Sequence, residues 1–248
     1  MRAVAAVGAA ALAAGAYRLA VAPTAQVLGR TVARCPTAAG QLALTYDDGP
    51  NPRATPALLE LLDRHAARAT FFLIGRWAER EPGIVRELVA AGHAIGNHTH
   101  THPRLPRLRA AAVREELHRC RGAVEDAGVT FSTLGGAALM RPPYGRRRPG
   151  TLRVVRAEGY VPVMWSVTGY DWRPGDSAER IGGRCMGARD GDIVLLHDGW
   201  SREPDADRSR SLAATRMALE HHGARGARFV TVPQLTDEPW AARQSQQP

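Results

Sequence analysis

The sequence predicts a single α/β domain built around a parallel sheet. Short apolar runs alternate with amphipathic stretches along most of the 248 residues, which is the pattern of strands joined by helical crossovers. This length, with a hydrophobic content of 44%, suits one globular domain with a full core and leaves no room for a second. In addition, the residues with the most evident chemistry each follow a different predicted strand, as they do on the carboxyl rim of βα folds.

Seven strands and six helices are expected. The strands are short apolar runs bounded by turn residues, and the helices have apolar residues at a spacing of three or four. The predicted strands cover 41–47, 69–75, 93–97, 138–141, 160–167, 192–197 and 227–232. The predicted helices cover 54–66, 82–91, 109–127, 147–158, 177–188 and 210–223.

Two aspartates end the first predicted strand. Asp47 and Asp48 follow the apolar run 42–46 and precede Gly49 and Pro50. At a frayed strand end, neighbouring carboxylates can reach one site from different angles, one holding a metal and the other handling a proton. The same residue types also make ordinary turns, so these positions by themselves leave both interpretations open.

Three alternating histidines follow the third predicted strand, at His98, His100 and His102. His98 and His102 are four residues apart, a spacing at which imidazole pairs commonly bind a divalent metal. Pro103 disfavours the α region for His102, so we expect a tight turn at the strand end rather than a long helix. The side chain of His100 is expected to diverge from this pair, and His93 is expected to pack or to lie at the surface.

One aspartate and two histidines form a ligand set that leaves coordination positions free for water and substrate. Such a set favours hydrolysis, in which a second, unligated carboxylate takes the proton of the attacking water. Zinc is the first expectation for the ion, and cobalt, nickel or iron suit the same ligands.

Four short motifs, in order, resemble those of the polysaccharide deacetylases with the chitooligosaccharide deacetylase homology domain, also called carbohydrate esterase family four. The family's first motif, Thr-Phe-Asp-Asp-Gly-Pro, is similar to 45–50 with Tyr in place of Phe, and its second, His-Thr-x-x-His-Pro, is similar to 98–103. Its third and fifth motifs, Arg-Pro-Pro-Tyr and Leu-x-His, stand at 141–144 and 195–197. The resemblance covers roughly residues 39–235 and implies an irregular, incomplete (β/α)7-type barrel.

Carried over position by position, the resemblance implies a role for each residue of the first two motifs. Asp47 is expected to act as the general base, while Asp48, His98 and His102 hold the metal. Arg141 is expected to lie against Asp47, where its cation keeps the carboxylate ionised.

The later motifs imply the rest of the site. The backbone N–H of Tyr144 is expected to join the metal in binding the oxyanion, and Tyr144 is also expected to contact the substrate. His197 is the expected general acid, and Asp171 is expected to keep it protonated. Leu195 and Trp172 are expected to line a small apolar pocket for the acetyl methyl group, although Trp172 is equally consistent with ordinary core packing.

The fourth motif departs from the family pattern, Asp-x-x-Asp-Trp, because Thr168 stands in place of the first aspartate. We expect retained chemistry with an altered rate or substrate preference.

The expected enzyme is a metal-dependent hydrolase that removes N-acetyl groups from amino-sugar polymers such as peptidoglycan or chitin-like oligomers. An esterase acting on O-acetyl xylan, a hydrolase of another small amide, and a weakly active carbohydrate-binding relic are the alternatives.

The first 22 residues have the pattern of an export signal, because Arg2 precedes the uncharged run 3–17. A cleaved signal peptide and an uncleaved membrane anchor both stay open, and a surface helix on a cytoplasmic protein is the third alternative. We expect a monomer that is exported and either secreted or anchored at the outer face of the cell membrane. The expected divisions are the signal or anchor at 1–22, a linker at 23–38, the catalytic domain at 39–238 and a tail at 239–248.

The formal net charge is +9, and the chain has no lysine. Nucleic acid is not an expected partner, because the arginines are dispersed and aromatic residues make up only 6%. The one dense run, Arg146 to Arg148, follows Tyr144 and is expected to be a solvated turn, with contact to an acidic polymer as the alternative.

The three cysteines, Cys35, Cys120 and Cys185, show no CxxC spacing. No thiolate metal site is therefore expected, although one pair could form a disulfide after export.

Overall fold

The computed structural model describes residues 22–236, so nearly all of the predicted export signal and the whole predicted tail lie outside the described residues. Within the range that is described, no helix combines the length and apolarity needed to cross a bilayer. The segment expected to be a linker packs on the domain. Its residues Val32 and Cys35 are buried, and Val32 forms a parallel bridge with Val163.

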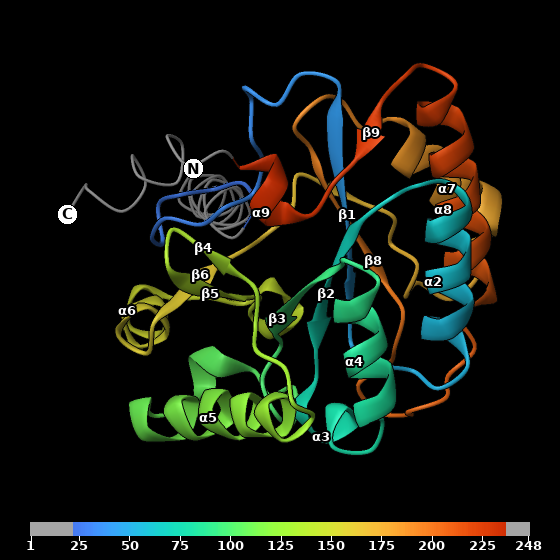
Figure 1. Ribbon diagram of the computed structural model, residues 1–248. Helices are drawn as coiled ribbons and strands as arrows, with labels where there is room; N and C mark the ends of the chain where they lie inside the picture. The colour runs from blue at the N-terminus through green and yellow to red at the C-terminus, as the bar shows by residue number, and fades with distance from the viewer. Residues whose placement is uncertain (1–21, 237–248) are drawn as a thin grey trace, which may run out of the picture.

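A largely parallel sheet forms the centre of the molecule (Figure 1). Its strands are β1 (Gln41–Asp47), β2 (Ala69–Leu73), β3 (Ala94–Asn97), β4 (Thr133–Leu134), β5 (Ala137–Met140), β6 (Tyr160–Pro162), β7 (Val167–Thr168), β8 (Ile193–His197) and β9 (Arg228–Phe229). The order is β4-β5-β3-β2-β1-β8-β7, with β6 paired to β5 and β9 paired to β1. No ladder joins β6 to β7 among the described residues, so the barrel stays open there.

Helices lie around the outside of the curved sheet (Figure 1). They are α2 (Ala54–Arg64), α3 (Gly75–Ala78), α4 (Pro82–Ala90), α5 (Ala110–Asp126), α6 (Pro149–Ala157), α7 (Ala178–Met186), α8 (Ser209–Gly223) and α9 (Val232–Leu235), with 3-10 turns η1 (Leu105–Arg107) and η2 (Pro143–Gly145). The six predicted helices are confirmed, each end lying within two residues of its expected position. The short α3 and α9 were not predicted, because a helix of one turn has too few residues to show a periodic pattern.

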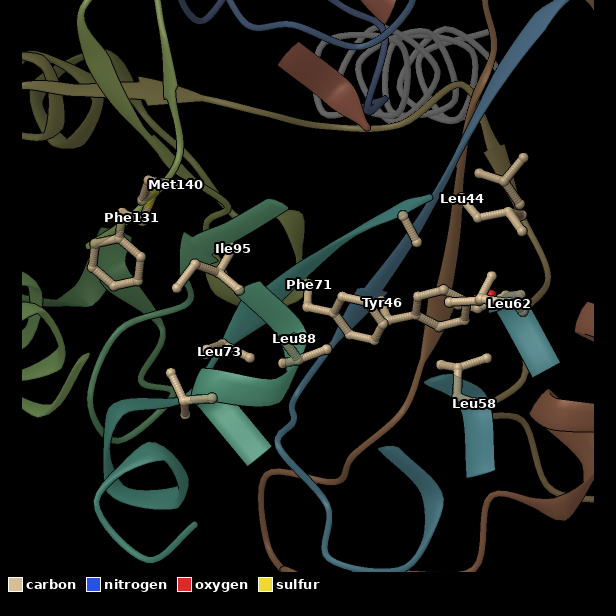
Figure 2. Packing of buried hydrophobic residues seen from close by; sticks show 14 of the residues in the cluster. Leu44, Tyr46, Leu58, Leu62, Phe71, Leu73, Leu88, Ile95, Phe131 and Met140 are labelled. Carbon is tan, nitrogen blue, oxygen red and sulfur yellow. The ribbon is translucent and has the colours of Figure 1, made fainter. Parts of the chain in front are cut away.

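The strands bury side chains on both faces, because helices cover the outside and the barrel interior is filled. On the outer face, the ring of Tyr46 stacks on that of Phe71 with centroids 5.2 Å apart, among leucines such as Leu58 of α2 (Figure 2). Alternate residues point the other way. Phe72 and Leu195 therefore belong to a second cluster, which we call the inner cluster.

The prediction of one strand over 160–167 is wrong. The carbonyl oxygens of Val163 and Met164 accept hydrogen bonds from the buried guanidinium of Arg141, and the N–H of Met164 donates to Val32. These three backbone groups are thus taken by partners outside the named strands, and the strand divides into β6 and β7.

Other strand boundaries differ at the carboxyl ends. The strand expected over 69–75 stops at Leu73, and α3 follows. The strand expected over 227–232 reaches only Phe229, because Thr231 begins α9 with a capping box. The strand expected over 138–141 forms an antiparallel hairpin with β4, which was not predicted because it is two residues long.

Candidate active site

Both aspartates at the end of β1 face the same site. In a continuing strand, the side chain of residue 48 would point away from that of residue 47. Asp48 instead has a φ of 73°, uncommon outside glycine. The Nε2 atom of His98 consequently lies 3.7 Å from Oδ2 of Asp47 and 3.5 Å from Oδ1 of Asp48. The backbone turn at Asp48 therefore brings both carboxylates to one imidazole.

The histidine segment 98–102 is a tight turn after β3, as Pro103 predicted. Thr99 and His102 have φ values of 68° and 61°. The N–H of His102 donates to Oγ1 of Thr99 at 3.1 Å, and the N–H of Thr99 donates to Oδ1 of Asn97 at 2.7 Å. This geometry places Nε2 of His102 at 3.2 Å from Oδ1 of Asp48.

Asp48, His98 and His102 each offer a ligand atom, and these atoms lie within 4.8 Å of one another. Nδ1 of His98 lies 2.8 Å from the carbonyl oxygen of Arg141. Since a carbonyl only accepts, Nδ1 carries the proton and Nε2 presents its lone pair. Oδ1 of Asp48 is buried without a hydrogen-bond partner, which costs free energy unless a cation binds it. The three residues therefore fit a divalent metal ion.

The protonation states of this cluster also suit a cation. Burial raises the pKa of Asp48, but its contacts with His98 and His102 outweigh burial and hold the pKa below its ordinary value. Burial lowers the pKa of His102 to about 4, against the opposing charge of Asp48. An ionised carboxylate and a neutral imidazole are the forms that bind metals.

Arg141 holds one oxygen of Asp47. Its side chain is fully buried, and Nη1 donates to Oδ1 of Asp47 at 2.7 Å and to Oγ1 of Thr45 at 2.8 Å. The guanidinium also lies 4.1 Å from the ring centre of Phe72. Because Oδ1 of Asp47 is taken, Oδ2 is the oxygen that faces His98.

His197 ends β8 and is held by Asp171. The backbone N–H of His197 donates to Oδ2 of Asp171, and Nδ1 lies 2.9 Å from Oδ1. Burial lowers the pKa of His197, but the charge and hydrogen bond of Asp171, with the charges of Asp48 and Asp47, raise it to about 9. The imidazole is therefore protonated at neutral pH.

Trp172 lies near this imidazole and packs against the cluster that contains Leu195. The ring centroid of Trp172 is 5.1 Å from that of His197, in an edge-on arrangement. Trp172 is partly buried and packs against the inner cluster, which contains Leu195. The two residues predicted to line an apolar pocket thus belong to one packed group.

Tyr144 lies in the turn η2 with a φ of 59°. Its ring centroid is 4.4 Å from that of His102, and 52% of the residue is exposed.

The arginine run that follows Tyr144 is not a fully solvated turn. Arg147 is buried and donates to the carbonyls of Ala22 and Ala25, while Arg148 donates to that of Leu108. The prediction of a solvated turn is therefore wrong at Arg147, because carbonyls far away in the sequence hold its guanidinium.

Sequence reasoning missed one carboxylate that holds the histidine turn. Oε2 of Glu116, on α5, accepts from the N–H groups of His100 and Thr101 at 3.0 and 2.8 Å, and Oε1 accepts from the hydroxyl of Thr101 at 2.7 Å. No spacing in the sequence relates a mid-helix glutamate to this turn. A second missed contact is the N–H of Ser201, which donates to Oδ2 of Asp48 at 3.2 Å.

The remaining polar candidates lie outside the candidate metal-binding cluster of Asp48, His98 and His102. Nε2 of His100 lies 2.8 Å from Nη2 of Arg119 and must accept, since a guanidinium only donates. His93 packs as expected, its Nδ1 accepting from the N–H of Ala69. Oγ1 of Thr168 accepts from the N–H of Tyr170. All three cysteines are buried and free, so the disulfide alternative is not realised in this structure.

Known proteins resemble this chain in both sequence and fold. Residues 35–163 match the polysaccharide deacetylase family. A chitooligosaccharide deacetylase of Azorhizobium caulinodans is 37% identical over 213 residues, covering 84% of this chain and 99% of that protein. A peptidoglycan-N-acetylglucosamine deacetylase of Bacillus cereus is 34% identical over 198 residues, covering 79% and 68%.

A family 4 carbohydrate esterase from Streptomyces lividans, in complex with acetate, has a similar structure. The TM-score is 0.69 at 31% identity, covering 80% of this chain and 96% of that one. These similarities confirm the resemblance predicted from the four motifs and the irregular barrel that it implied. The chain belongs to the polysaccharide deacetylase family.

Proposed function

We propose that the protein is a metal-dependent hydrolase that removes N-acetyl groups from amino-sugar polymers or oligomers of the peptidoglycan or chitin type. The observation that carries the proposal is the buried, unpartnered Oδ1 of Asp48 beside Nε2 of both His98 and His102. A second carboxylate, Asp47, lies against the same imidazole. The relation to named deacetylases supports the choice of reaction.

In this proposal Asp48, His98 and His102 hold one divalent ion. Zinc is the first choice, and cobalt, nickel or iron would suit the same donors. The bound ion would lower the pKa of water at the site toward neutrality and would polarise the acetyl carbonyl.

Asp47 is the general base, and Arg141 positions it. Oδ2 of Asp47 takes the proton from the attacking water, while Arg141 fixes Oδ1 and so sets the direction of Oδ2. The backbone N–H of Tyr144 donates to the acetyl oxygen as negative charge develops there. The left-handed turn at Tyr144 supports this role, because its backbone is fixed between prolines and Gly145 before substrate arrives.

His197 is the general acid, and Asp171 keeps it protonated. His197 gives its proton to the departing amine, and Asp171 keeps the imidazole charged until that step. Trp172 and Leu195 accept the acetyl methyl group, which suits the apolar cluster to which they belong.

We further propose that the protein acts outside the cytoplasmic membrane as a monomer. The signal-like pattern of the first 22 residues supports export.

Metal analysis combined with acetate release tests the proposal. The full chain is assayed on N-acetylglucosamine oligomers, on peptidoglycan and on O-acetyl xylan, as purified, after chelation and after addition of zinc or cobalt. We expect acetate from the N-acetylated glycans, loss on chelation and recovery with metal. Release from acetyl xylan alone would replace the proposal by the esterase alternative.

A weakly active carbohydrate-binding relic is the second candidate, favoured by Thr168. Its hydroxyl keeps a local turn but supplies no charge. Thr168→Asp restores the carboxylate of the family pattern, and Thr168→Asn is the neutral control. A large gain in turnover with Asp alone would support the relic, whereas a fast parent that gains nothing would exclude it.

A further inference from the structure

An exposed aromatic ring borders the metal-binding cluster. Tyr144 is among the few large apolar side chains that the described residues leave exposed, and its ring lies 4.4 Å from that of His102. Sugar rings present apolar faces that pack on such platforms, so an exposed tyrosine beside the reacting centre suits contact with the glycan.

Arg104 lies on this ring. It comes two residues after His102, and its Cζ is 5.5 Å from the centre of the Tyr144 ring. The next residue, Leu105, is fully buried and anchors the turn η1. Arg104 is exposed, and the structure between residues 22 and 236 shows no carboxylate in an ion pair with it. A cation is thus held beside the site without an acidic partner.

Neighbouring arginines are engaged elsewhere. Arg141 is paired with Asp47. Arg76, Arg147 and Arg148 donate to backbone carbonyls. Arg104 differs from these in that neither a carboxylate nor a backbone carbonyl holds it, so its contact with the Tyr144 ring leaves its N–H groups for a ligand.

We infer that Arg104, stacked on Tyr144, binds a carboxylate carried by the sugar unit next to the one that loses its acetyl group. The guanidinium edge matches a carboxylate in a two-point contact that a sugar hydroxyl cannot reproduce. The enzyme therefore prefers glycans with free lactyl or uronate carboxylates to neutral chitin oligomers. This inference rests on the proposed function and narrows its substrate class.

The test uses one glycan in two forms. Peptidoglycan strands freed of peptides are prepared with their lactyl carboxylates free or converted to methylamides, and acetate release is measured with the zinc-loaded full chain. For Arg104→Ala we expect KM for the acid strands to rise about tenfold with kcat unchanged, and KM for the methylamide strands to change less than about twofold. Arg104→Lys should recover part of the loss, because it keeps charge but not the planar edge.

Arg107→Ala is the matched control, since Arg107 is exposed on the same turn η1 and has no contact with Tyr144. An equal change for both forms of the strand, or none for either, would overturn the inference. Calorimetry with both forms of the strand measures binding and so tests the inference about Arg104 separately from the proposed deacetylase function. Strands that bind through Arg104 without releasing acetate would refute the deacetylase proposal alone, and equal dissociation constants for the two forms would refute the carboxylate subsite.

Discussion

Nη1 of Arg141 lies 2.7 Å from Oδ1 of Asp47, and the guanidinium that makes this ion pair has no exposed surface. The same side chain donates to the carbonyls of Val163 and Met164, where the sheet opens between β6 and β7. A buried cation is tolerated only when its N–H groups have acceptors. The orientation of the proposed base and the opening of the barrel therefore share one cause.

Asp47→Asn should lower kcat by about 10²- to 10⁴-fold, the usual contribution of a general base. The metal should stay bound, because Asp47 is not one of the three ligands proposed. The free energy of unfolding should also fall by about 3 kcal/mol, since Arg141 remains buried without its counter-charge. Turnover and metal content are compared at a temperature where thermal unfolding shows both proteins folded.

Unchanged turnover in Asp47→Asn would remove Asp47 from the role of base. Loss of metal in this variant would instead assign it to the ligand set.

His102→Ala should lose its divalent ion, because Nε2 of His102 lies 3.2 Å from the unpartnered Oδ1 of Asp48. Elemental analysis after gel filtration measures the metal per chain. His100→Ala is the control, since Nε2 of His100 is bonded to Arg119 and the residue lies outside the cluster. Equal metal content in the two variants would refute the ligand assignment.

Asp171→Asn should move the alkaline limit of activity. The pKa of His197 is about 9 in the folded protein, raised by Asp171 above its ordinary value of 6.5. The protonated imidazole that the proposed acid step needs is lost above that value, and removal of the charge of Asp171 should shift the limit of kcat/KM downward. The titration of His197 followed by NMR gives the same pKa independently of turnover.

The raised pKa of His197 also predicts how the free energy of unfolding depends on pH. A pKa raised on folding contributes stability that is fully present below about pH 6.5 and is lost as pH rises through about 9. Wild type and Asp171→Asn should therefore differ most in unfolding free energy below about pH 6.5, and the difference should shrink as pH rises through about 9. An alkaline limit that does not move in Asp171→Asn would separate His197 from the acid step.

Glu116→Ala should weaken metal binding by about 10- to 100-fold, the effect of removing groups that orient ligands. Glu116 accepts from the backbone of His100 and Thr101, between the two histidine ligands proposed. Competition with a chromogenic chelator measures the affinity, and Glu116→Gln should retain part of it because the amide oxygen still accepts.

Glu115→Ala is the control for this change, since Glu115 is the exposed neighbour on α5. If Glu116→Ala binds metal as tightly as Glu115→Ala, the carboxylate supports the fold but does not position the histidines.

The sequence by itself determined most of the helices and strands and the grouping of Asp48, His98 and His102. The six longer helices and the strands β1, β2, β3 and β8 follow from local periodicity, which needs no knowledge of distant contacts. Parallel strands end on the same edge, so residues after β1 and β3, such as Asp48, His98 and His102, were expected to meet there, and their ligand atoms do.

Only the tertiary structure decided how those residues are held. The left-handed turn at Asp48, the contact of Glu116 with the histidine turn, the burial of Arg147 and the gap between β6 and β7 each depend on partners far away in the chain. Local propensity cannot foresee them, because a buried polar group takes whichever donor or acceptor the packed chain brings within reach.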